Sequence, residues 1–367
     1  MNKITCCFIG LGLLGGSIAK SIKRAFGDES TIIAFDPNPG TLSFAKKEGV
    51  IDVISNSIEL TDFSKCNYLF LCAPITSNIK NLLFVKDLLP PSCLITDVGS
   101  VKTDIHNNIK LLGLEKQFIG GHPMAGSEKT GYVNSTNRLL ENAYYILTPT
   151  PLVSPEKINQ YKELVLSLGA IPLILGYKEH DYVTAAVSHL PHIVAAALVN
   201  LVKDSDTKDG IMNLIAAGGF KDITRISSSS ATMWQQISIE NQDNISLLLN
   251  DYINALTLIQ EHLLEKNQLK LYQLFDGARN YRDSFIDASS GPIKKLYIIY
   301  VDIPDEPGVI ATIATILANH NISLKNIGIV HNREFEEGVL RIEFYKEESL
   351  TDSVILLKNQ GYLVYKR

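Results

Sequence analysis

The sequence predicts an α/β chain of three domains. A doubly wound parallel sheet occupies residues 1–176, an all-α domain residues 177–290, and a βαββαβ domain residues 291–367. Three observations support this. Strand and helix patterns alternate in the first segment, strand patterns vanish in the second, and they return in a different order in the third. At 367 residues the chain is also too long for one ordinary domain.

The first segment contains short apolar runs rich in strand-forming residues, separated by helical patterns. The expected strands are Ile4–Ile9, Ile32–Phe35, Tyr68–Cys72, Leu94–Asp97, Gln117–Gly120, Tyr144–Leu147 and Ile171–Leu175. Because helices that alternate with strands act as crossovers, we expect the strands to be parallel.

The second segment carries long helical patterns, which predict helices over Val183–Val202 and Asn244–Phe275. The apolar residues of the latter cover a wide arc of the helix. Such a surface needs cover on several sides, so we expect a homodimer.

The third segment follows a break at Ala288–Pro292 and has the order strand, helix, strand, strand, helix, strand. The elements are Leu296–Ile303, Val309–Ala318, Ser323–Val330, Gly338–Tyr345, Leu350–Asn359 and Tyr362–Tyr365. This order predicts a small α+β domain.

Composition argues against several classes of protein. The net charge of -5 and the scattered basic residues give no basic surface for nucleic acid or an anionic membrane. The five cysteines form no C-x-x-C pair, so we expect reduced, buried thiols. We find no leader pattern and no apolar stretch approaching the ~20 residues of a membrane span, and we therefore expect a cytoplasmic protein.

A glycine-rich loop follows the first expected strand and precedes an expected helix over Ser17–Phe26. It reads Gly10-Leu11-Gly12-Leu13-Leu14-Gly15, a G-x-G-x-x-G motif. The first glycine permits a tight turn, the second lets the backbone approach a pyrophosphate, and the third lets helix and strand pack closely. The motif predicts a Rossmann dinucleotide site that includes Leu13 and Leu14. A glycine turn without a nucleotide is the alternative.

Acidic and polar residues at later strand ends support the nucleotide reading. Asp36 ends the second strand, where its carboxylate can bind the adenosine ribose and would repel a 2′-phosphate, so NAD is favoured over NADP. Ala73, Pro74 and Asp97 end further strands at the edge where ligands bind. Asp97 could instead cap the helix that follows Ser100.

His122 is the best candidate for a catalytic base. It lies in a Gly-Gly-His-Pro loop, where the glycines are expected to open space around its imidazole. A dehydrogenase acting on a hydroxyl needs a group that takes the proton as hydride leaves carbon, and histidine suits this near neutral pH.

Two more clusters lie in the expected helical domain. His189 and His192 are spaced as metal ligands can be, but no third ligand accompanies them, so we expect no metal site; a structural role for either is an alternative. Lys221 and Arg225 follow a glycine pair. Arg225 could clamp a carboxylate through two hydrogen bonds, or form a surface ion pair with Asp222 or Glu240.

These residues together resemble the prephenate dehydrogenase family, including its arogenate-preferring relatives, along nearly the whole chain. The motifs that carry the resemblance are Gly10–Ser17, Asp97–Lys102, Gly120–Glu128, Ser188–His192, Gly219–Arg225 and Met233–Trp234. The chain departs from the usual family pattern at Lys221, where most members have Arg, and at Ile223, where they have Thr. The loss of a planar fork at Lys221 leaves Arg225 as the stronger candidate for bidentate binding.

The resemblance implies that prephenate loses a hydride to NAD+ while His122 accepts a hydrogen bond or the proton from the ring hydroxyl, after which CO2 leaves. It also implies that Ser100 contacts the hydroxyl or orients His122, and that Arg225 and His192 hold substrate carboxylates. The remaining motif residues implied to line the substrate pocket are Glu128, Lys221 and Trp234.

The tail from Leu296 resembles an ACT domain through Asp302–Gly308 and Asn321–Asn326. This resemblance implies an amino-acid effector, for which tyrosine is the natural candidate, with Asp305, Gly308 and Asn326 as the expected binding residues. A domain used only for assembly is the alternative.

Two other readings of the whole chain stay open at this point. Arogenate dehydrogenase differs only in having an amine in place of the keto group of the substrate side chain, and no residue decides firmly between them. A nucleotide-sensing regulator without turnover would not need His122, Ser100 and Arg225 together, which argues against that reading.

Overall fold

The computed structural model describes residues 3–59, 61–126, 129–288, 297–304, 306–331 and 338–366. The chain divides into two compact units, Met1–Leu258 and Ile259–Arg367, and each is described by itself. The predicted domain limits at 176 and 290 do not coincide with this division and stay a prediction.

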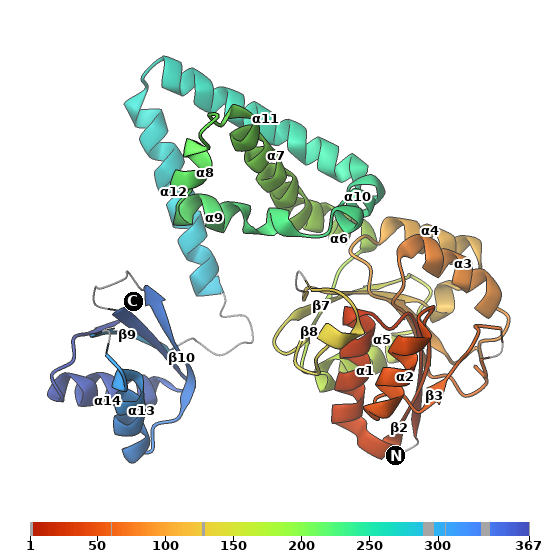
Figure 1. Cartoon of the computed structure of the whole chain (residues 1–367). Helices are drawn as coiled ribbons and strands as arrows, with labels where there is room; N and C mark the ends of the chain where they lie inside the picture. Colours follow the sequence, from red (N-terminus) through yellow and green to blue (C-terminus); the bar gives the residue numbers. More distant parts are fainter. Residues whose placement is uncertain are drawn as a thin grey trace. The chain divides into compact units, whose positions relative to one another are not determined.

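The first unit begins with a five-stranded parallel sheet in the order β3-β2-β1-β4-β5 (Figure 1). The strands are β1 (Ile4–Ile9), β2 (Ser30–Phe35), β3 (Val53–Ile54), β4 (Tyr68–Leu71) and β5 (Leu94–Asp97). The helices between them are α1 (Leu13–Phe26), α2 (Pro39–Lys47), α3 (Ile75–Val85) and α4 (Thr103–Leu111). The strand order reverses between β1 and β4, and doubly wound sheets bind their ligands at the carboxyl ends of the strands at such a point. The predicted doubly wound sheet is confirmed; β3 was missed because two residues carry no pattern.

A second, three-stranded sheet contains β6 (Ile119–Pro123), β7 (Tyr144–Pro149) and β8 (Ile171–Ile174). The strands β6 and β7 are antiparallel, so the prediction that all these strands run parallel is wrong. The described residues between them, 124–126 and 129–143, are largely loop and contain no helical crossover of the kind that parallel strands need. Helix α5 (Pro155–Ser167) supplies such a crossover, and β7 and β8 are parallel.

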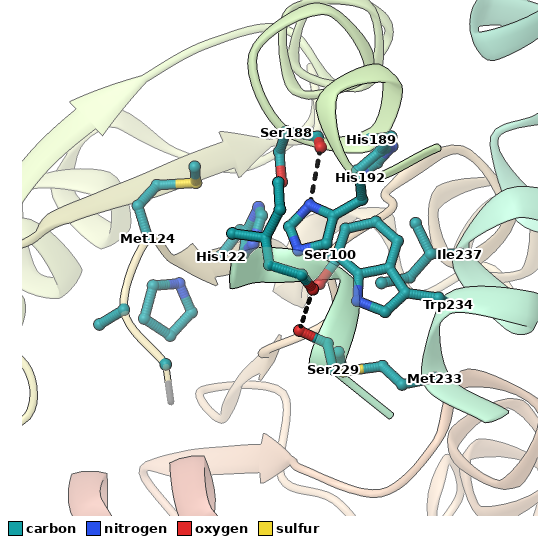
Figure 2. Close-up of a pocket in the computed structure, with 14 residues that line it drawn as sticks. Ser100, His122, Met124, Ser188, His189, His192, Ser229, Met233, Trp234 and Ile237 are labelled. Atoms are coloured by element: carbon teal, nitrogen blue, oxygen red, sulfur yellow. Dashed lines mark hydrogen bonds between the residues drawn. The ribbon is translucent and has the colours of Figure 1, made fainter. Parts of the chain in front are cut away.

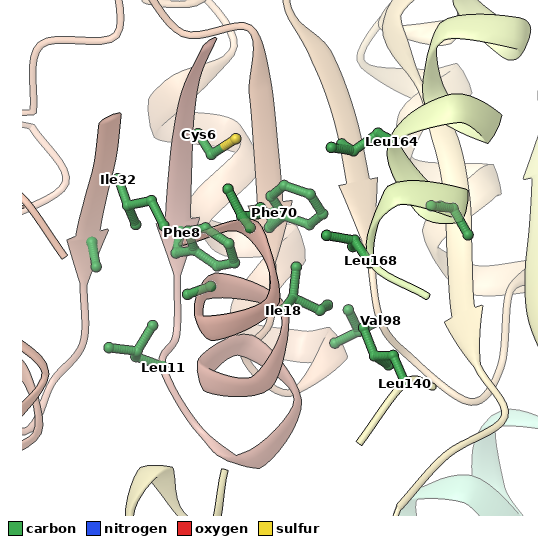
Figure 3. Close-up of a cluster of buried hydrophobic side chains, with 14 of the residues drawn as sticks. Cys6, Phe8, Leu11, Ile18, Ile32, Phe70, Val98, Leu140, Leu164 and Leu168 are labelled. Carbon is green, nitrogen blue, oxygen red and sulfur yellow. The ribbon is translucent and has the colours of Figure 1, made fainter. Parts of the chain in front are cut away.

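Apolar clusters cover both faces of the five-stranded sheet. Cys6 and Phe8 of β1 point to one face, where Phe8 stacks on Phe70 with ring centroids 4.8 Å apart (Figure 3). Cys7 and Ile9 point to the other. All five cysteines are free thiols and only Cys72 is not fully buried, which confirms the predicted reduced thiols.

The helices that follow belong to the first unit up to Leu258. They are α6 (Tyr177–Thr184), a π-helical turn (Ala185–His189), α7 (Leu190–Ser205), α8 (Ile211–Ile215), α9 (Gly218–Thr224), α10 (Ala231–Glu240) and the start of α11 (Gln242–Leu264). Residues 177–205 are continuous helix, and by length and composition this helix could cross a membrane, with a mean hydropathy of 1.6 in its most apolar window. The expectation that no apolar stretch reaches such a length is therefore wrong. Only 17% of that window is buried within the chain, so its apolar surface needs another partner.

The predicted single helix over 244–275 is wrong, because α11 ends at Leu264 and α12 (Gln268–Ala288) begins after a turn. Lys266 adopts a left-handed backbone with φ of 53°, and the Asn267 side chain accepts a hydrogen bond from the Lys270 amide at 3.2 Å. An asparagine cap in place of glycine or proline made this break difficult to detect.

The rest of the second unit is a four-stranded antiparallel sheet in the order β10-β11-β9-β12 with two helices. Its elements are β9 (Tyr297–Ile303), α13 (Val309–Asn319), β10 (Leu324–His331), β11 (Gly338–Phe344), α14 (Glu347–Asn359) and β12 (Val364–Lys366). Ile299, Val301 and Leu340 of the sheet pack against Ile313 and Leu357 of the helices. The predicted βαββαβ order is confirmed.

Candidate active site

The glycine loop at the end of β1 has the geometry that a pyrophosphate site needs. Gly10 has φ of +94°, and a Cβ there would lie 2.8 Å from the Ala73 backbone nitrogen. A Cβ on Gly15 would lie 2.6 Å from the Gly10 carbonyl oxygen, so the third glycine allows α1 to pack on the loop. A Cβ on Gly12 would meet nothing within 4 Å, and no described side chain caps α1 there. The open space and the uncapped helix N-terminus fit an anion.

Asp36 lies beside this loop at the end of β2. Its two carboxylate oxygens accept hydrogen bonds from the amides of Leu11 at 2.7 Å and Asn38 at 2.9 Å. Each oxygen has a further lone pair that can accept from a ribose hydroxyl. Leu13 and Leu14 form the first turn of α1, so that helix begins earlier than predicted.

Ala73 and Pro74 follow β4 at the same edge of the sheet, with Pro74 at the N-cap of α3. Asn78 of that helix donates from Nδ2 to the Ala73 carbonyl at 2.7 Å, which fixes the backbone of this turn. These two residues are therefore placed at the carboxyl edge of the sheet, where a cofactor would lie.

Asp97 ends β5 and is 2% exposed. It accepts hydrogen bonds from the amides of Gly99 at 2.9 Å and Gly121 at 3.2 Å, and it forms an ion pair with the fully buried Lys102. The Lys102 ammonium also donates to the Gly121 carbonyl at 2.8 Å. The alternative that Asp97 caps α4 is wrong, because its carboxylate ties β5 to β6.

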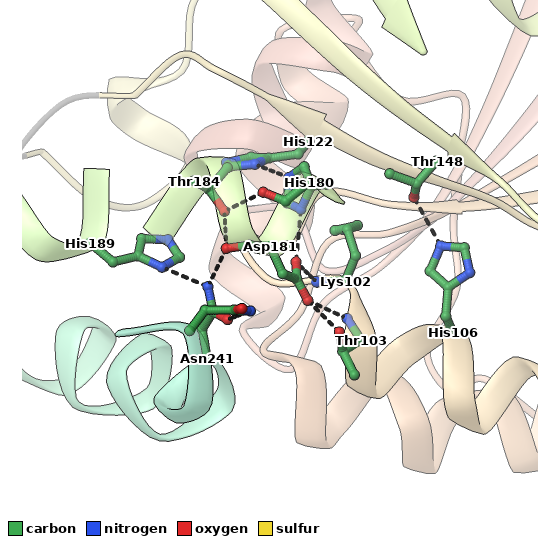
Figure 4. A network of polar contacts seen from close by, with 12 residues as sticks. Lys102, Thr103, His106, His122, Thr148, His180, Asp181, Thr184, His189 and Asn241 are labelled. Atoms are coloured by element: carbon green, nitrogen blue, oxygen red, sulfur yellow. Dashed lines mark hydrogen bonds and ion pairs between the residues drawn. The ribbon is translucent and has the colours of Figure 1, made fainter. Parts of the chain in front are cut away.

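His122 lies on β6 within a network of buried polar groups (Figure 4). Its Nδ1 is 2.8 Å from Nε2 of His180, and Nδ1 of His180 is 2.8 Å from the Asp181 carboxylate. The glycines before His122 serve close packing and do not open space around the ring: a Cβ on Gly121 would lie 2.6 Å from the Asp97 carbonyl oxygen.

The π-helical turn brings a second pair of histidines to the site. A π turn shifts the helical register, and such turns often occur at functional sites. His189 accepts a hydrogen bond at Nδ1 from Asn241 at 3.1 Å, and the same amide group donates to the Asp181 carbonyl at 2.7 Å. His192 Nδ1 is 3.0 Å from the Ser188 carbonyl, and its ring stacks on Trp234 with centroids 3.6 Å apart.

A cavity of about 300 Å³ joins these groups within the first unit (Figure 2). Ser100 and His122 line it from the α/β part, and His192 and Trp234 from the helices. Nε1 of Trp234 is buried and has no hydrogen-bond partner among the described residues, so it is available to a ligand. The cavity thus combines imidazoles, hydroxyls and an indole donor.

Neither of the two predicted cations is among the residues that line this cavity. Arg225 follows α9 and is exposed, as is Lys221 within α9. Burial lowers the pKa of the His192 imidazole, and the positive charge of Arg225 lowers it further. Glu128 lies outside the described residues. Among the described residues, no three His, Cys, Asp or Glu side chains are grouped to hold a metal ion.

Burial keeps the central imidazoles neutral. Burial, together with the nearby His180, Lys102 and His189, holds the pKa of His122 well below its ordinary value. Burial also lowers the pKa of His189 to about 4. Burial opposes ionisation of Asp181, yet hydrogen bonds from His180, Thr103 and the Lys102 amide hold its pKa below the ordinary value. The neutral ring of His122 keeps a nitrogen lone pair that can accept a hydrogen bond from a hydroxyl, and the Asp181 carboxylate lies behind it, on the far side of His180.

The residues behind His122 were not predicted from the sequence: they are His180, Asp181, Asn241 and the buried cation Lys102. Lys102 ends the Asp97–Lys102 motif, but nothing in the sequence indicates that its side chain is buried. The adjacent residues His180 and Asp181 were the one sequence feature that could have pointed to this network. With no partner near them in the sequence, such a pair is typical of an exposed helix surface.

A Rossmann sheet with an open glycine loop, next to a cavity holding a neutral buried histidine, defines a dinucleotide-dependent dehydrogenase. The models of two family domains match the chain: "Prephenate dehydrogenase, nucleotide-binding domain" over residues 18–172 and "Prephenate dehydrogenase, dimerization domain" over residues 177–276. The chain belongs to the prephenate dehydrogenase family of oxidoreductases, and its cofactor is NAD.

Relatives cover most of the chain. Prephenate dehydrogenase of Bacillus subtilis is 37% identical over 94% of this chain and 93% of its own length. The structure of Aquifex aeolicus prephenate dehydrogenase with hydroxyphenyl propionate and NAD+ matches with a TM-score of 0.73 at 31% identity, covering 78% of this chain and 99% of that one. Synechocystis arogenate dehydrogenase matches with a TM-score of 0.69 at 28% identity, covering 77% of this chain and all of its own (100%). These likenesses confirm the predicted family, the fold class and NAD as cofactor.

Proposed function

We propose that this chain catalyses the NAD+-dependent oxidative decarboxylation of prephenate to 4-hydroxyphenylpyruvate, with release of CO2 and NADH, in tyrosine biosynthesis. The observation that carries the proposal is the position of His122, a neutral buried imidazole that lines one cavity with Ser100, His192 and Trp234. The family relationship supplies the substrate.

The residues of the chain would divide the chemistry as follows. Gly10, Gly12 and the first turn of α1 hold the pyrophosphate, and Asp36 holds the ribose. When bound there, NAD+ supplies the hydride acceptor. His122 accepts the hydrogen bond or proton of the ring hydroxyl, and Ser100 contacts the hydroxyl or orients His122. Aromatisation of the ring provides the driving force for loss of CO2, so the main task of the protein is orientation.

The substrate carboxylates would be held by His192 and Arg225, and the family motifs imply Lys221, Trp234 and Glu128 as further residues of the substrate site. The stack of His192 on Trp234 fixes both rings, and the unpartnered Nε1 of Trp234 supports a role as donor. The charge of Arg225 lowers the pKa of His192, so the two groups are near enough to share an anionic target.

Arogenate is the second candidate substrate. The match to Synechocystis arogenate dehydrogenase, which covers 77% of this chain, supports arogenate as an alternative substrate. The two substrates share the ring and its hydroxyl, so the same His122 chemistry would serve both.

The family's dimerization domain supports a homodimer. Exposed apolar residues on α11, including Leu247, Ile253 and Leu256, and the largely uncovered 177–205 helix offer the surface it would bury. We propose that a partner subunit covers this surface and that the enzyme acts in the cytoplasm.

The C-terminal domain would bind tyrosine as a feedback inhibitor. A cavity of about 470 Å³ lies at the start of α13, lined by Gly308, Val309 and Ile303 among others. Gly308 has φ of +94°, so a side chain there would be strained. Asn326 lies on β10 outside this lining, with Nδ2 3.4 Å from Glu343, and Asp305 lies outside the described residues. Equal calorimetric titrations of tyrosine into the full chain and a chain ending near Ser290 would refute this role and leave assembly as the function.

The test of the activity is NADH or NADPH formation with prephenate and arogenate offered separately, each with NAD+ or NADP+. Rapid turnover of prephenate with NAD+ is expected. Turnover of arogenate alone would make arogenate the substrate. If neither compound is turned over, the proposal is contradicted.

A further inference from the structure

The Asp181 carboxylate fixes the direction of a buried chain of hydrogen bonds. It is 1% exposed and accepts from the Lys102 amide at 2.8 Å and from the amide and hydroxyl of Thr103 at 2.8 and 2.6 Å. Two of these donors are backbone N–H groups at the start of α4, and their direction is fixed by the main chain. An ionised carboxylate only accepts hydrogen bonds, so Nδ1 of His180 must donate to it.

The direction then passes through His180 to His122. A neutral imidazole with its hydrogen on Nδ1 has an acceptor at Nε2. His122 Nδ1 lies 2.8 Å from that Nε2, so it is the donor, with the rings edge to face at 69°. The remaining ring nitrogen of His122, Nε2, is therefore the acceptor.

We infer that His180, oriented by Asp181, is a positioning residue that holds His122 in the tautomer whose Nε2 accepts from the substrate hydroxyl. The inference rests on the proposed role of His122. The opposite tautomer would place a hydrogen on the nitrogen that has to receive one, and it would set the lone pair of His180 Nδ1 against a carboxylate. A histidine whose tautomer is set by a carboxylate partner loses most of its activity when that partner is changed.

A further polar group behind the site, Asn241, strengthens the arrangement. Its Nδ2 donates to the Asp181 backbone carbonyl and to His189, which joins α6 to the loop between α10 and α11. His180 is fully buried, so water does not compete for its nitrogens.

Two variants of His180 separate tautomer control from packing. His180→Gln keeps an acceptor near the position of Nε2, whereas His180→Leu keeps bulk without one. We expect His180→Leu to lower kcat about 100-fold or more with a KM for prephenate within about threefold, since a positioned base contributes 10²–10⁴. His180→Gln is expected to recover at least about tenfold of that loss. The inference is overturned if His180→Leu keeps the wild-type kcat. It is also overturned if the kcat of His180→Gln is no higher than that of His180→Leu.

Nitrogen NMR of histidine-labelled wild-type protein reads the tautomer directly, without substrate, and it decides the matter even if His180→Leu does not fold. The His122 resonances are assigned by their absence from His122→Asn. A hydrogen on Nδ1 supports the inference. A hydrogen on Nε2, as a doubly protonated His180 would impose, overturns it. If the enzyme turns over neither prephenate nor arogenate, the proposed function is contradicted. The tautomer of His122 can still be measured by NMR in that case.

Discussion

The same substitution by alanine is expected to lower the stability of the protein at Gly10 and its affinity for NAD+ at Gly12. Gly10→Ala places a Cβ 2.8 Å from backbone atoms of Ala73 and Cys72 at φ of +94°. The left-handed conformation costs about 1–2 kcal/mol and the overpacking about 1–3 kcal/mol, so we expect a loss of about 2–5 kcal/mol. Gly12→Ala meets nothing within 4 Å, and its backbone conformation suits any residue, so its cost stays within about 1 kcal/mol.

The pair is compared by thermal unfolding and by calorimetric titration of NAD+. Gly10→Ala should lower the melting temperature by about 5–15 °C, whereas Gly12→Ala should leave it nearly unchanged and weaken NAD+ binding at least about tenfold. A Gly12→Ala protein that binds NAD+ like the wild type, or a Gly10→Ala protein of unchanged stability, would refute the reading of this loop.

Three further outcomes are expected. Burial lowers the pKa values of His106 and His189 to about 4, so between pH 6.5 and 4 the unfolded chain binds more protons than the folded chain. The free energy of unfolding, measured with urea, should therefore fall as the pH drops from 6.5 to 4. A free energy that does not change over this range would contradict the expectation. Ile253→Glu with Leu256→Glu places charges on side chains that are 51% and 46% exposed, so light scattering should report monomers with helical content preserved; a persisting dimer would put the interface elsewhere. Arg225→Lys keeps the charge and loses the fork, so KM for prephenate should rise about tenfold with a smaller change in kcat, and an unchanged KM would remove Arg225 from carboxylate binding.

The sequence was informative where function depends on local patterns. The glycine loop, the strand ends around Asp36 and Asp97, and the order of elements in both α/β parts are written in short stretches of chain. The family motifs placed Ser100, His122, His192 and Trp234, and the structure brings these four to one cavity.

Long-range contacts lay beyond what the sequence could predict. His122 and His180 are 58 residues apart and come from a strand and a helix of different parts of the chain, so no spacing links them. The antiparallel β6–β7 pair depends on the path of a loop. The break between α11 and α12 depends on a left-handed lysine, which carries no breaker signal.

The central claim, that His122 accepts the hydrogen bond or the proton of the substrate hydroxyl, is tested most directly by His122→Asn. His106→Asn is a matched control, because His106 is also buried but hydrogen-bonds Thr148 and stacks on Tyr177 outside the cavity lining. The steady-state rate of NADH formation from prephenate and the affinity for NAD+ are measured for both. We expect kcat to fall about 10²–10⁴-fold in His122→Asn alone, with NAD+ affinity unchanged. A His122→Asn enzyme that keeps its kcat would contradict the account.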